Sequence, residues 1–270
     1  MRACRDLTFV LALWAAPVGA ADGDTALWRL GCGAPGAVDG AVFAQDGAFA
    51  GSTVTLTNSC YLIRHRGQYV VWDAGLPEAA LPEDAPTLAG QLAALGLAPG
   101  DVSTVVLSHH HLDHTGQLGA FDQAELVIGA ADWGEVWAVD AGTADNGYVA
   151  PSFFAPWLEA DGRVRPILGD LDLFGDGVVT IKAAPGHTAG SQFLLLDLPQ
   201  TGYVILSGDV AHFERQFDAR KVAVGTHDGD AAQAAMDHVA QLAASLPALL
   251  VIGHDPLHIG LLPPFPEAAR

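Results

Sequence analysis

The stretch VVLSHHHLDHTGQL, residues 105–118, places four histidines and one aspartate within six positions, directly after an apolar run. The apolar residues 105–107 have the character of a buried strand, so the histidines begin where that strand would end. Neutral imidazole and carboxylate are ligands for zinc and similar divalent cations. The pattern H-x-H-x-D-H therefore predicts a metal site at the end of a strand, and the fold must bring further ligands to it from other parts of the chain.

Further apolar segments rich in Val, Ile and Leu, bounded by Gly, Asp or Pro, predict β-strands. They cover residues 25–33, 52–65, 68–75, 103–108, 125–130, 178–186, 191–198, 203–209 and 248–255. Two segments, 85–97 and 228–246, instead place apolar residues at helical spacing and predict helices. A mixture of strands and helices favours an α/β fold in which helices cover the sheets.

Several of these strands run directly into a side chain of a type that binds metals. These side chains are Asp73, His109, His187, Asp209 and His254. A strand end is a rigid support, and α/β folds tend to place their sites on one rim of a sheet. We therefore expect these groups to converge on one rim, together with the loop at 109–114.

Together these motifs predict a site for two divalent cations. The predicted ligands are His109, His111, Asp113, His114, His187, Asp209 and His254. A carboxylate such as Asp209 can bridge two cations about 3.5–4 Å apart. Zinc is the expected ion, and Mn, Fe or Co are alternatives. A metal pair with an open position is typical of a hydrolase, because it lowers the pKa of bound water from 15.7 to about 7. His110 is expected to point away from the metals.

The charge of the chain excludes several classes of partner. There are 31 acidic against 12 basic residues, and the formal net charge is −19 at pH 7. Such a charge repels the phosphates of nucleic acids and of anionic lipids. We expect a small-molecule substrate and no nucleic acid. The oligomeric state stays open, with a homodimer as one alternative.

The first twenty residues predict a secretory signal peptide. Arg2 and Arg5 precede an apolar run at 7–16, and small residues follow at 18–20. The run is too short for a membrane span. We expect cleavage after Ala20 or Ala21, a single domain over residues 21–270, and a periplasmic or secreted protein with no membrane span in its mature form. An uncleaved N-terminal anchor is the alternative.

The cysteines are compatible with export. Cys4 would leave with the signal peptide, and Cys32 and Cys60 would remain as a pair in an oxidising compartment. A disulfide between them would stabilise the fold by about 3–4 kcal/mol in the chain-entropy account. Two buried free thiols are the alternative, and the sequence leaves this point open.

The segments SHHHLDHTGQL, APGHTAGS, LSGD and IGHD, in this order, resemble the motifs of the metallo-β-lactamase superfamily. The resemblance extends over residues 25–266. It implies an αβ/βα four-layer sandwich, in which two facing mixed β-sheets have helices outside and a dinuclear site on one rim. It also implies the division of the ligands: one metal on His109, His111 and His187, the other on Asp113, His114 and His254, with Asp209 between them.

Within the superfamily the chain is most similar to the N-acyl-homoserine lactonases. The segment SCYLIRHRGQYVVWDAGLP, residues 59–77, resembles theirs. A bridging Asp209 argues against true metallo-β-lactamases, which lack that carboxylate. The resemblance implies that Asp73 lies behind the metal ligands, with a plain turn carboxylate as the alternative. Those lactonases have a tyrosine three residues after the bridging aspartate, where this chain has His212. An imidazole N–H could donate the same hydrogen bond to the substrate; packing near Phe213 is the alternative.

Two segments with aromatic residues, 41–51 and 133–158, could line an acyl-chain groove, since ligand pockets are mostly apolar. The candidate pocket residues are Phe43, Phe49, Trp133, Trp137, Phe153 and Phe154. The alternative for each of them is ordinary packing of a helix against the outer face of a sheet.

The resemblance thus implies an exported hydrolase that opens the lactone ring of N-acyl-homoserine lactones by attack of a hydroxide held between two metals. Asp113 would orient the hydroxide and pass a proton to the leaving alkoxide, and His212 would help to stabilise the oxyanion. The alternatives are a metallohydrolase of another ester, such as an organophosphate triester or a thioester, a β-lactamase, and a metal-binding protein without catalytic activity.

Overall fold

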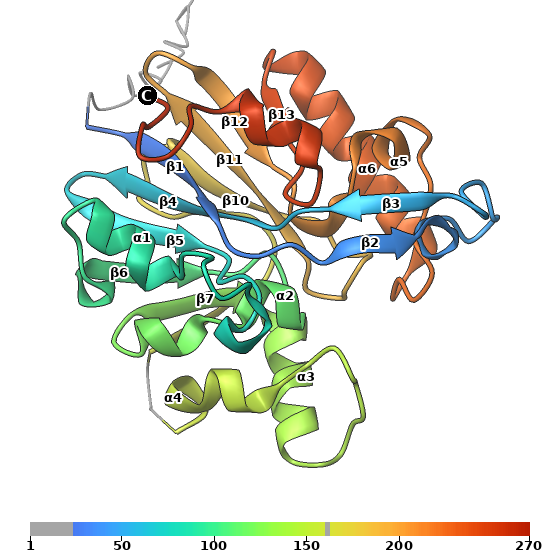
Figure 1. Cartoon of the computed structure of the whole chain (residues 1–270), viewed down its shortest axis with the longest axis horizontal. Coiled ribbons are helices and arrows are strands. Elements are labelled where there is room, and N and C mark those ends of the chain that lie inside the picture. Colours follow the sequence, from blue (N-terminus) through green and yellow to red (C-terminus); the bar gives the residue numbers. More distant parts are fainter. Residues whose placement is uncertain (1–23, 160–162) are drawn as a thin grey trace, which may run out of the picture.

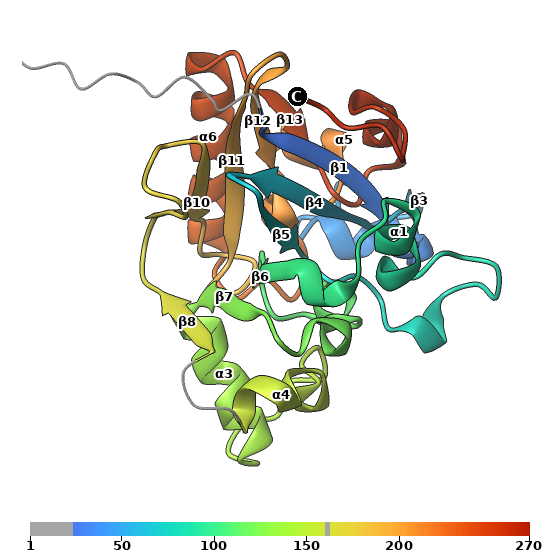
Figure 2. The same cartoon turned by 90° about the vertical axis from the view of Figure 1, so that its left-hand side faces the viewer.

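The computed structural model describes residues 24–159 and 163–270. The predicted signal peptide therefore lies outside the described residues. Two β-sheets face each other, α6 covers the outer face of one of them, and α1 lies on the outer face of the other (Figure 1, Figure 2). The αβ/βα four-layer sandwich expected from the sequence is confirmed.

The first sheet has six strands in the order β1-β4-β5-β6-β7-β8. Their bounds are Ala26–Gly31, Ser59–His65, Gln68–Trp72, Val102–Val106, Glu125–Gly129 and Val164–Ile167 in that order. β1, β4 and β5 pair antiparallel, whereas β5 to β8 run parallel, so the sheet is mixed. The carboxyl ends of β5 and β6 therefore meet at one edge, which brings Asp73 next to the histidine-rich loop.

The second sheet has five strands in the order β13-β12-β11-β10-β9. From β9 to β13 their bounds are Leu171–Asp172, Val179–Ala183, Gln192–Leu198, Gly202–Leu206 and Leu249–Val251. β9 to β12 pair antiparallel, and β13 is parallel to β12. The loops that follow β12 and β13 leave from the same edge, and they carry Asp209 and His254.

The predicted strand over 52–65 is two strands. β3 (Thr53–Leu56) pairs with β2 (Gly36–Asp39) in a separate hairpin, and β4 begins at Ser59. In the break between them, the Thr57 carbonyl accepts a hydrogen bond from His254 Nδ1 at 2.8 Å, and Asn58 Nδ2 donates to the Asp113 carbonyl at 2.5 Å. The interruption of the strand thus supplies backbone and side-chain contacts to two predicted metal ligands.

Both predicted helices are present. α1 (Leu88–Ala94) begins after Thr87, whose hydroxyl accepts from the Gly90 N–H, and α6 (Gly229–Ser245) begins after Asp228, whose carboxylate accepts from the Ala231 N–H. Such capping satisfies N–H groups that the first turn leaves free. The other helices are α2 (Leu112–Thr115), α3 (Ala130–Asp140), α4 (Ala155–Leu158) and α5 (Glu214–Asp218).

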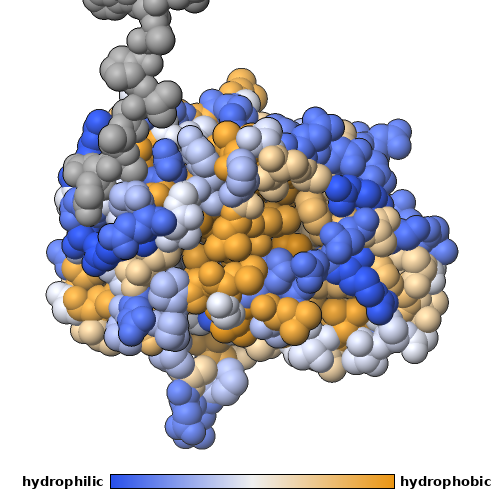
Figure 3. Space-filling model, turned by 90° about the horizontal axis from the view of Figure 1, so that it is seen from above, coloured by the Kyte–Doolittle hydropathy of each residue, from blue (hydrophilic) through white to orange (hydrophobic). Residues whose placement is uncertain are grey.

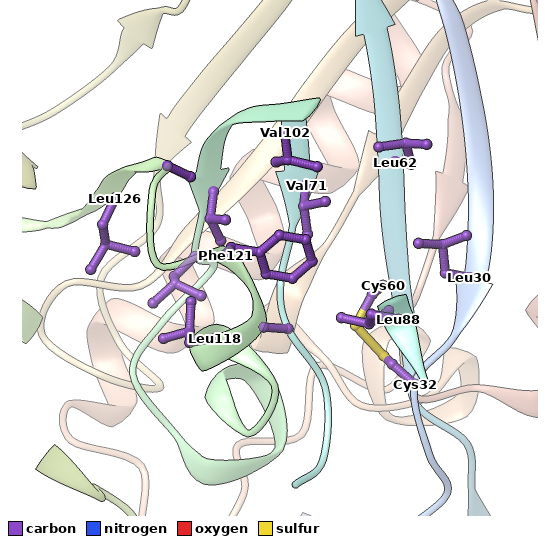
Figure 4. Packing of buried hydrophobic residues seen from close by; sticks show 14 of the residues in the cluster. Leu30, Cys32, Cys60, Leu62, Val71, Leu88, Val102, Leu118, Phe121 and Leu126 are labelled. Atoms are coloured by element: carbon purple, nitrogen blue, oxygen red, sulfur yellow. A yellow bond between two sulfur atoms is a disulfide. The ribbon is translucent and has the colours of Figure 1, made fainter. Parts of the chain in front are cut away.

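Three apolar cores hold these layers together. One lies between the two sheets, one between the second sheet and α6, and one between the first sheet and the segments around α1 and α3. Figure 4 shows side chains of the last core, with Leu62, Val71 and Phe121 among them. Complete burial of such a side chain contributes about 1.5–3 kcal/mol. These cores hold the two sheets in place, and the sheets position the strand ends that carry the predicted metal ligands.

Cys32 and Cys60 form a disulfide within this same core (Figure 4). It joins the residue after β1 to the second residue of β4, two strands that are already paired. The structure thus favours the disulfide over two free thiols. It places a covalent link beside the segment 57–58 that contacts the predicted metal ligands.

The surface is not uniformly polar. Figure 3 shows, on the face seen from above, a central apolar area bordered by hydrophilic side chains. Large apolar side chains are also exposed on the 3₁₀ turn at Pro256–Leu261, where Leu257 is 77% exposed. Among the described residues, no helix is both long enough and apolar enough to cross a membrane.

Candidate metal centre

The seven predicted metal ligands meet at one rim of the two sheets. His109 and His111 lie in the loop after β6, Asp113 and His114 in α2, and the others in the loops after β10, β12 and β13. Three clusters bring together all seven, with the ligand atoms of each cluster within 4.8 Å of one another. They are His109–His111–His187, His109–His114–Asp209 and Asp113–His114–His254.

A glycine allows the two motif loops to approach each other. Gly208, next to Asp209, has φ +51°, and a Cβ at this position would lie 2.7 Å from the Ser108 Cβ and 2.9 Å from the Gln192 carbonyl oxygen. Glycine adopts this backbone conformation without steric cost and leaves room for the neighbouring chain. The segment LSGD therefore needs its glycine to bring Asp209 to the histidines after β6.

The carboxylate of Asp209 lies between two groups of imidazoles. Its Oδ2 is 3.4 Å from His187 Nε2 and 3.8 Å from His109 Nε2. Its Oδ1 is 3.2 Å from His254 Nε2 and 3.3 Å from His114 Nε2. One oxygen faces each group, which is the arrangement required of a carboxylate that bridges two cations. We call the Oδ2 side, with His109, His111 and His187, the first side. The Oδ1 side, with Asp113, His114 and His254, is the second side.

Hydrogen bonds fix the tautomers of the histidines on the second side. His114 Nδ1 donates to Asp73 Oδ2 at 2.9 Å, and His254 Nδ1 donates to the Thr57 carbonyl at 2.8 Å. In a neutral imidazole only one nitrogen carries hydrogen, so each Nε2 keeps its lone pair. Both lone pairs point toward Asp209, as metal coordination requires.

Asp73 has the place that the resemblance implies. Besides His114, it binds the backbone N–H of Ser108 through Oδ1 at 2.6 Å. It is 2% exposed and has φ +61°, a conformation that aspartate and asparagine adopt more readily than most residues. Asp73 therefore orients His114 and ties the end of β5 to the loop after β6.

Two buried polar atoms in this cluster indicate that metal ions fit between these side chains. His109 Nε2 and Asp209 Oδ1 are buried and have no hydrogen-bond partner. Buried groups of this kind are costly unless something pairs with them. The donor set consists of imidazole nitrogens and carboxylate oxygens, the ligands that zinc and similar ions take. The residues thus fit two divalent cations.

Without metal, the two sides differ in protonation. On the first side, burial lowers the pKa of His109 and His187 well below the usual range and that of His111 to about 4. On the second side burial also opposes charge, but Asp209 and Asp113 outweigh it, raising the pKa of His254 to about 9 and that of His114 well above its ordinary value. Burial disfavours the charged Asp209 too, yet the surrounding histidines hold its pKa well below its ordinary value.

His212 has a different environment from the one that the sequence suggested. Its Nδ1 lies 3.1 Å from Gln216 Oε1, which also accepts from the His212 backbone N–H at 2.8 Å. The nitrogen turned to the site is Nε2, 3.3 Å from Asp209 Oδ2. Since Nδ1 donates, Nε2 of the neutral ring has no hydrogen to give to a substrate carbonyl. This orientation counts against the expected donor role of His212, which stays a prediction.

A cavity of about 350 Å³ opens above the metal-binding side chains. Its floor includes His111, Asp113, His187, Asp209, His212 and His254. Its wall consists of Pro35, Val38, Val42, Phe43, Leu56, Tyr148, Ala223, Val224 and Gly225. The hairpin of β2 and β3, the turn at 40–43 and the loop at 223–225 thus form most of an apolar wall.

Only one of the six predicted pocket aromatics lines this cavity, namely Phe43. Phe49 packs against Phe213 under the hairpin. Trp133, Phe153 and Phe154 pack into the core between the first sheet and α3, and Trp137 is 45% exposed on α3. Trp133 on α3, and Phe153 and Phe154 on the 3₁₀ turn Pro151–Phe154, therefore follow the packing alternative.

Sequence reasoning missed two contributors, Gln216 and the link between Val42 and Val224, whereas Tyr148 lies in the segment 133–158 that is expected from the sequence to line the pocket. Tyr148, 64% exposed, lies over the His111 ring with centroids 5.0 Å apart. Gln216 fixes the orientation of His212 and also donates to the Phe43 carbonyl at 3.2 Å. Val42 and Val224 join two distant loops by a backbone hydrogen bond of 2.8 Å. None of these belongs to a motif, although the spacing of Gln216 four residues after His212 on a helical turn could have been noticed.

His110 does not join the ligand clusters. Its Nε2 pairs with Glu135 Oε2 at 2.9 Å, and Glu135 in turn accepts from Asn146 at 2.6 Å. Asp132 lies 3.4 Å from the other ring nitrogen. This network connects the metal loop to α3 and to the segment that carries Tyr148.

Comparison with known proteins identifies the family. The sequence profile of the metallo-beta-lactamase superfamily matches residues 54–254. The N-acyl homoserine lactonase AttM of Azorhizobium caulinodans is 31% identical over 166 residues, which cover 62% of this chain and 63% of that protein. The match therefore spans less than two thirds of that relative. An N-acyl homoserine lactonase of Bacillus cereus is 23% identical over 227 residues, 76% of this chain and 84% of that protein.

Solved structures share the fold. A quorum-quenching N-acyl homoserine lactone lactonase superimposes with a TM-score of 0.75 at 20% identity, covering 91% of this chain and 98% of that one. AidC, a dizinc quorum-quenching lactonase, superimposes with a TM-score of 0.64 at 16% identity over 92% and 94% of the two chains. With the profile match over most of the chain, these findings show that the chain belongs to the metallo-β-lactamase superfamily.

Proposed function

We propose that the protein uses two divalent cations to open the lactone ring of N-acyl-homoserine lactones. The observation that carries this proposal is the cavity of about 350 Å³, whose floor is the metal centre and whose wall is apolar. A substrate with a hydrolysable ring at one end and an apolar chain at the other matches these two surfaces. Pockets that bind such ligands are mostly apolar with a few placed polar groups.

The charges around the cavity support a neutral substrate. No lysine or arginine is among the described residues that line it, whereas the carboxylates of Asp113 and Asp209 are. A substrate with carboxylates away from the reacting bond, such as a glutathione thioester, would find no lysine or arginine in this lining to pair with them. An N-acyl-homoserine lactone has no formal charge and needs no such partner.

Relatives of known activity support the same substrate class. AttM of Azorhizobium caulinodans and the matching Bacillus cereus protein are both N-acyl homoserine lactonases. A structure that superimposes with a TM-score of 0.75 has the product N-hexanoyl-L-homoserine bound at its catalytic metal centre. We extend this activity to the present chain because it has the same fold and a complete predicted ligand set.

The metal ions and Asp113 have different roles in the proposed reaction. When bound, the two cations would polarise the ring carbonyl and make water a nucleophile near neutral pH. Asp113 is the carboxylate best placed to handle protons. Its side chain is 28% exposed, whereas that of Asp209 is 5% exposed, and its Oδ2 lies 3.4 Å from His254 Nε2. We assign Asp113 to hold a proton of the attacking water and to pass it to the leaving alkoxide.

A substrate competition tests this function. The purified protein, reloaded with zinc or cobalt, is given N-acyl-homoserine lactones of short and long chain, a phosphotriester and a β-lactam, and proton release is followed. We expect metal-dependent ring opening to exceed the other reactions. A chelator-treated sample and Asp209→Ala serve as controls. Cleavage of the phosphotriester or β-lactam without lactone turnover would leave the metal centre in place and refute the substrate.

We further propose that the protein is exported to the periplasm or secreted. The supporting observations are the signal-like composition of residues 1–20 and the disulfide between Cys32 and Cys60, which persists in oxidising compartments. Mass spectrometry of the protein isolated from a periplasmic fraction or culture medium should find a chain that begins at Ala21 or Asp22. An intact chain confined to the cytoplasm, with both thiols reduced, would contradict the proposal.

A further inference from the structure

We infer that His212 is an eighth metal ligand, which binds a divalent cation through Nε2 on the first side of the centre. The metal motifs do not include this residue, and the resemblance to the lactonases gives its position to a tyrosine that contacts the substrate. The inference rests on the metal centre of the proposed function and is independent of which ester the enzyme cleaves.

Gln216 determines which nitrogen of His212 carries the hydrogen. The Gln216 amide is oriented by two contacts: Oε1 accepts from the His212 backbone N–H at 2.8 Å, and Nε2 donates to the Phe43 carbonyl at 3.2 Å. With Oε1 in this orientation, His212 Nδ1 at 3.1 Å must be a donor. The neutral ring therefore has its hydrogen on Nδ1 and its lone pair on Nε2.

That lone pair faces an atom that cannot donate to it. Nε2 lies 3.3 Å from Asp209 Oδ2, an acceptor, and it belongs to a cluster with Asp209 and His187 whose ligand atoms all lie within 4.8 Å of one another. A lone pair against a carboxylate is unfavourable unless a cation lies between them. A divalent cation shared by these three side chains removes the conflict.

The same kind of hydrogen bond, from Nδ1, orients two predicted ligands on the second side. His114 and His254 each donate from Nδ1, to Asp73 and to the Thr57 carbonyl, and direct Nε2 to Asp209 at 3.3 and 3.2 Å. His212 donates from Nδ1 to Gln216 and directs Nε2 to the other oxygen at 3.3 Å. Its ring is nearly parallel to that of His254, with an interplanar angle of 13° and centroids 5.8 Å apart. The hydrogen bond behind the ring is the one that metal-binding histidines make.

The competing arrangement is an imidazolium that donates from Nε2 to Asp209. It would satisfy the contact in a protein without metal. Once two divalent cations bind around Asp209, a third positive charge at the same carboxylate is opposed by repulsion from both. The two arrangements of His212 can therefore be distinguished in the metal-loaded protein.

Nuclear magnetic resonance of protein labelled with nitrogen-15 histidine and loaded with cadmium-113 distinguishes them. We expect scalar coupling between one cadmium and His212 Nε2, a hydrogen on Nδ1, and coupling of the same cadmium to His187. His212 is assigned from the resonances that disappear in His212→Phe. Absence of cadmium coupling at His212, or a hydrogen on its Nε2 in the loaded protein, would overturn the inference.

A metal competition provides a second measurement that does not depend on turnover. His212→Phe removes the nitrogen and keeps a planar ring, and should weaken binding on the first side by at least about 10–100-fold, the loss known for weaker, indirect contacts to ligands. His227→Phe is the matched control, since its side chain is exposed nearby and its backbone N–H bonds His187. An unshifted second cadmium resonance shows that the variant has folded. Equal metal retention by His212→Phe and the unmodified protein would refute the assignment, whereas absent lactone turnover would bear only on the proposed function.

Discussion

The two sides of Asp209 use the same ligand types in opposite electrostatic settings. The first side has three imidazoles whose pKa values burial depresses, with that of His111 at about 4. The second side has two imidazoles whose pKa values nearby carboxylates raise, with that of His254 at about 9. The largest raising contribution comes from Asp209, whose Oδ1 lies 3.3 and 3.2 Å from the Nε2 atoms of His114 and His254, and Asp113 adds to it.

This contrast shows that ligands of the same residue type can differ in protonation before a metal binds. The histidines of the first side are neutral at neutral pH and already present lone pairs. Those of the second side hold protons that a cation must displace, because metal ligands have to be deprotonated. We therefore expect the first side to fill before the second when metal is added in steps.

The largest effect should follow from removing the group that both sides share. Asp209→Asn keeps the shape of the side chain and removes its charge, so the two sides lose the anion that they share. Breaking such a buried contact costs about 3–5 kcal/mol, equivalent to roughly a thousandfold in binding or rate. We expect bound metal to fall from two ions to one or none, and kcat/KM to fall by about this factor.

The control for this substitution is Asp218→Asn, which changes an exposed carboxylate on α5. Metal content by elemental analysis and lactone turnover are measured on both variants. Two firmly bound metals in Asp209→Asn would show that the carboxylate does not bridge, and the division of the centre into two sides would lose its basis.

The next effect is a difference in how pH changes the two affinities. Below its pKa of about 9, His254 holds a proton that opposes the metal, and His114 holds a second one, so second-side affinity should rise by at least about tenfold per pH unit toward pH 9. Between pH 6 and pH 8 this is at least about a hundredfold. The first side should change much less, because His109, His111 and His187 are already neutral at pH 6. Competition with a coloured chelator at both pH values measures the two constants, and parallel slopes would contradict the comparison.

A smaller effect should follow at Asp73, and on one side only. Asp73→Asn retains a residue type that tolerates φ +61°. If its amide oxygen still accepts from Ser108, its NH₂ faces His114, which must then accept at Nδ1 and carry its hydrogen on Nε2, where the metal would bind. We expect second-side affinity to fall about 10–100-fold and first-side affinity to be retained. Calorimetric titration of the variant would reveal equal losses on both sides if Asp73 only supports the fold.

The metal centre could be predicted from the sequence because its residues lie in short motifs. Each motif combines a strand, which the apolar pattern shows, with a polar residue just beyond it, so the convergence of His109, Asp209 and His254 needs only the strand ends to meet. The resemblance then supplied the order of the sheets. Asp73 could be placed by the same reasoning, since it follows a strand parallel to its neighbour.

The rest of the site depends on contacts that no local pattern encodes. The break at 57–58 divides one predicted strand into two. There Thr57 and Asn58 form hydrogen bonds with His254 and Asp113, which are distant in sequence. The tautomer of His212 depends on Gln216 and, through it, on the Phe43 carbonyl. Aromatic content alone could not separate Phe43, in the cavity wall, from Phe154, in the outer core, since both are almost fully buried.

The smallest predicted effect concerns the cavity wall, which should respond to the substrate's chain and not to its ring. Val42 is 41% exposed and lines the cavity on the turn at 40–43. The ring must lie at the metal-binding floor, so only a long acyl chain should reach Val42. Val42→Ala removes two methyl groups that are partly buried, and the loss of about 0.8 kcal/mol corresponds to roughly a fourfold increase in KM for long-chain lactones.

The control is Leu168→Ala, because the Leu168 side chain is 88% exposed and does not line this cavity. A short-chain lactone should be unaffected by either substitution. An equal rise in KM for short and long chains would place Val42 beside the ring and would require the acyl chain to leave the cavity by another path.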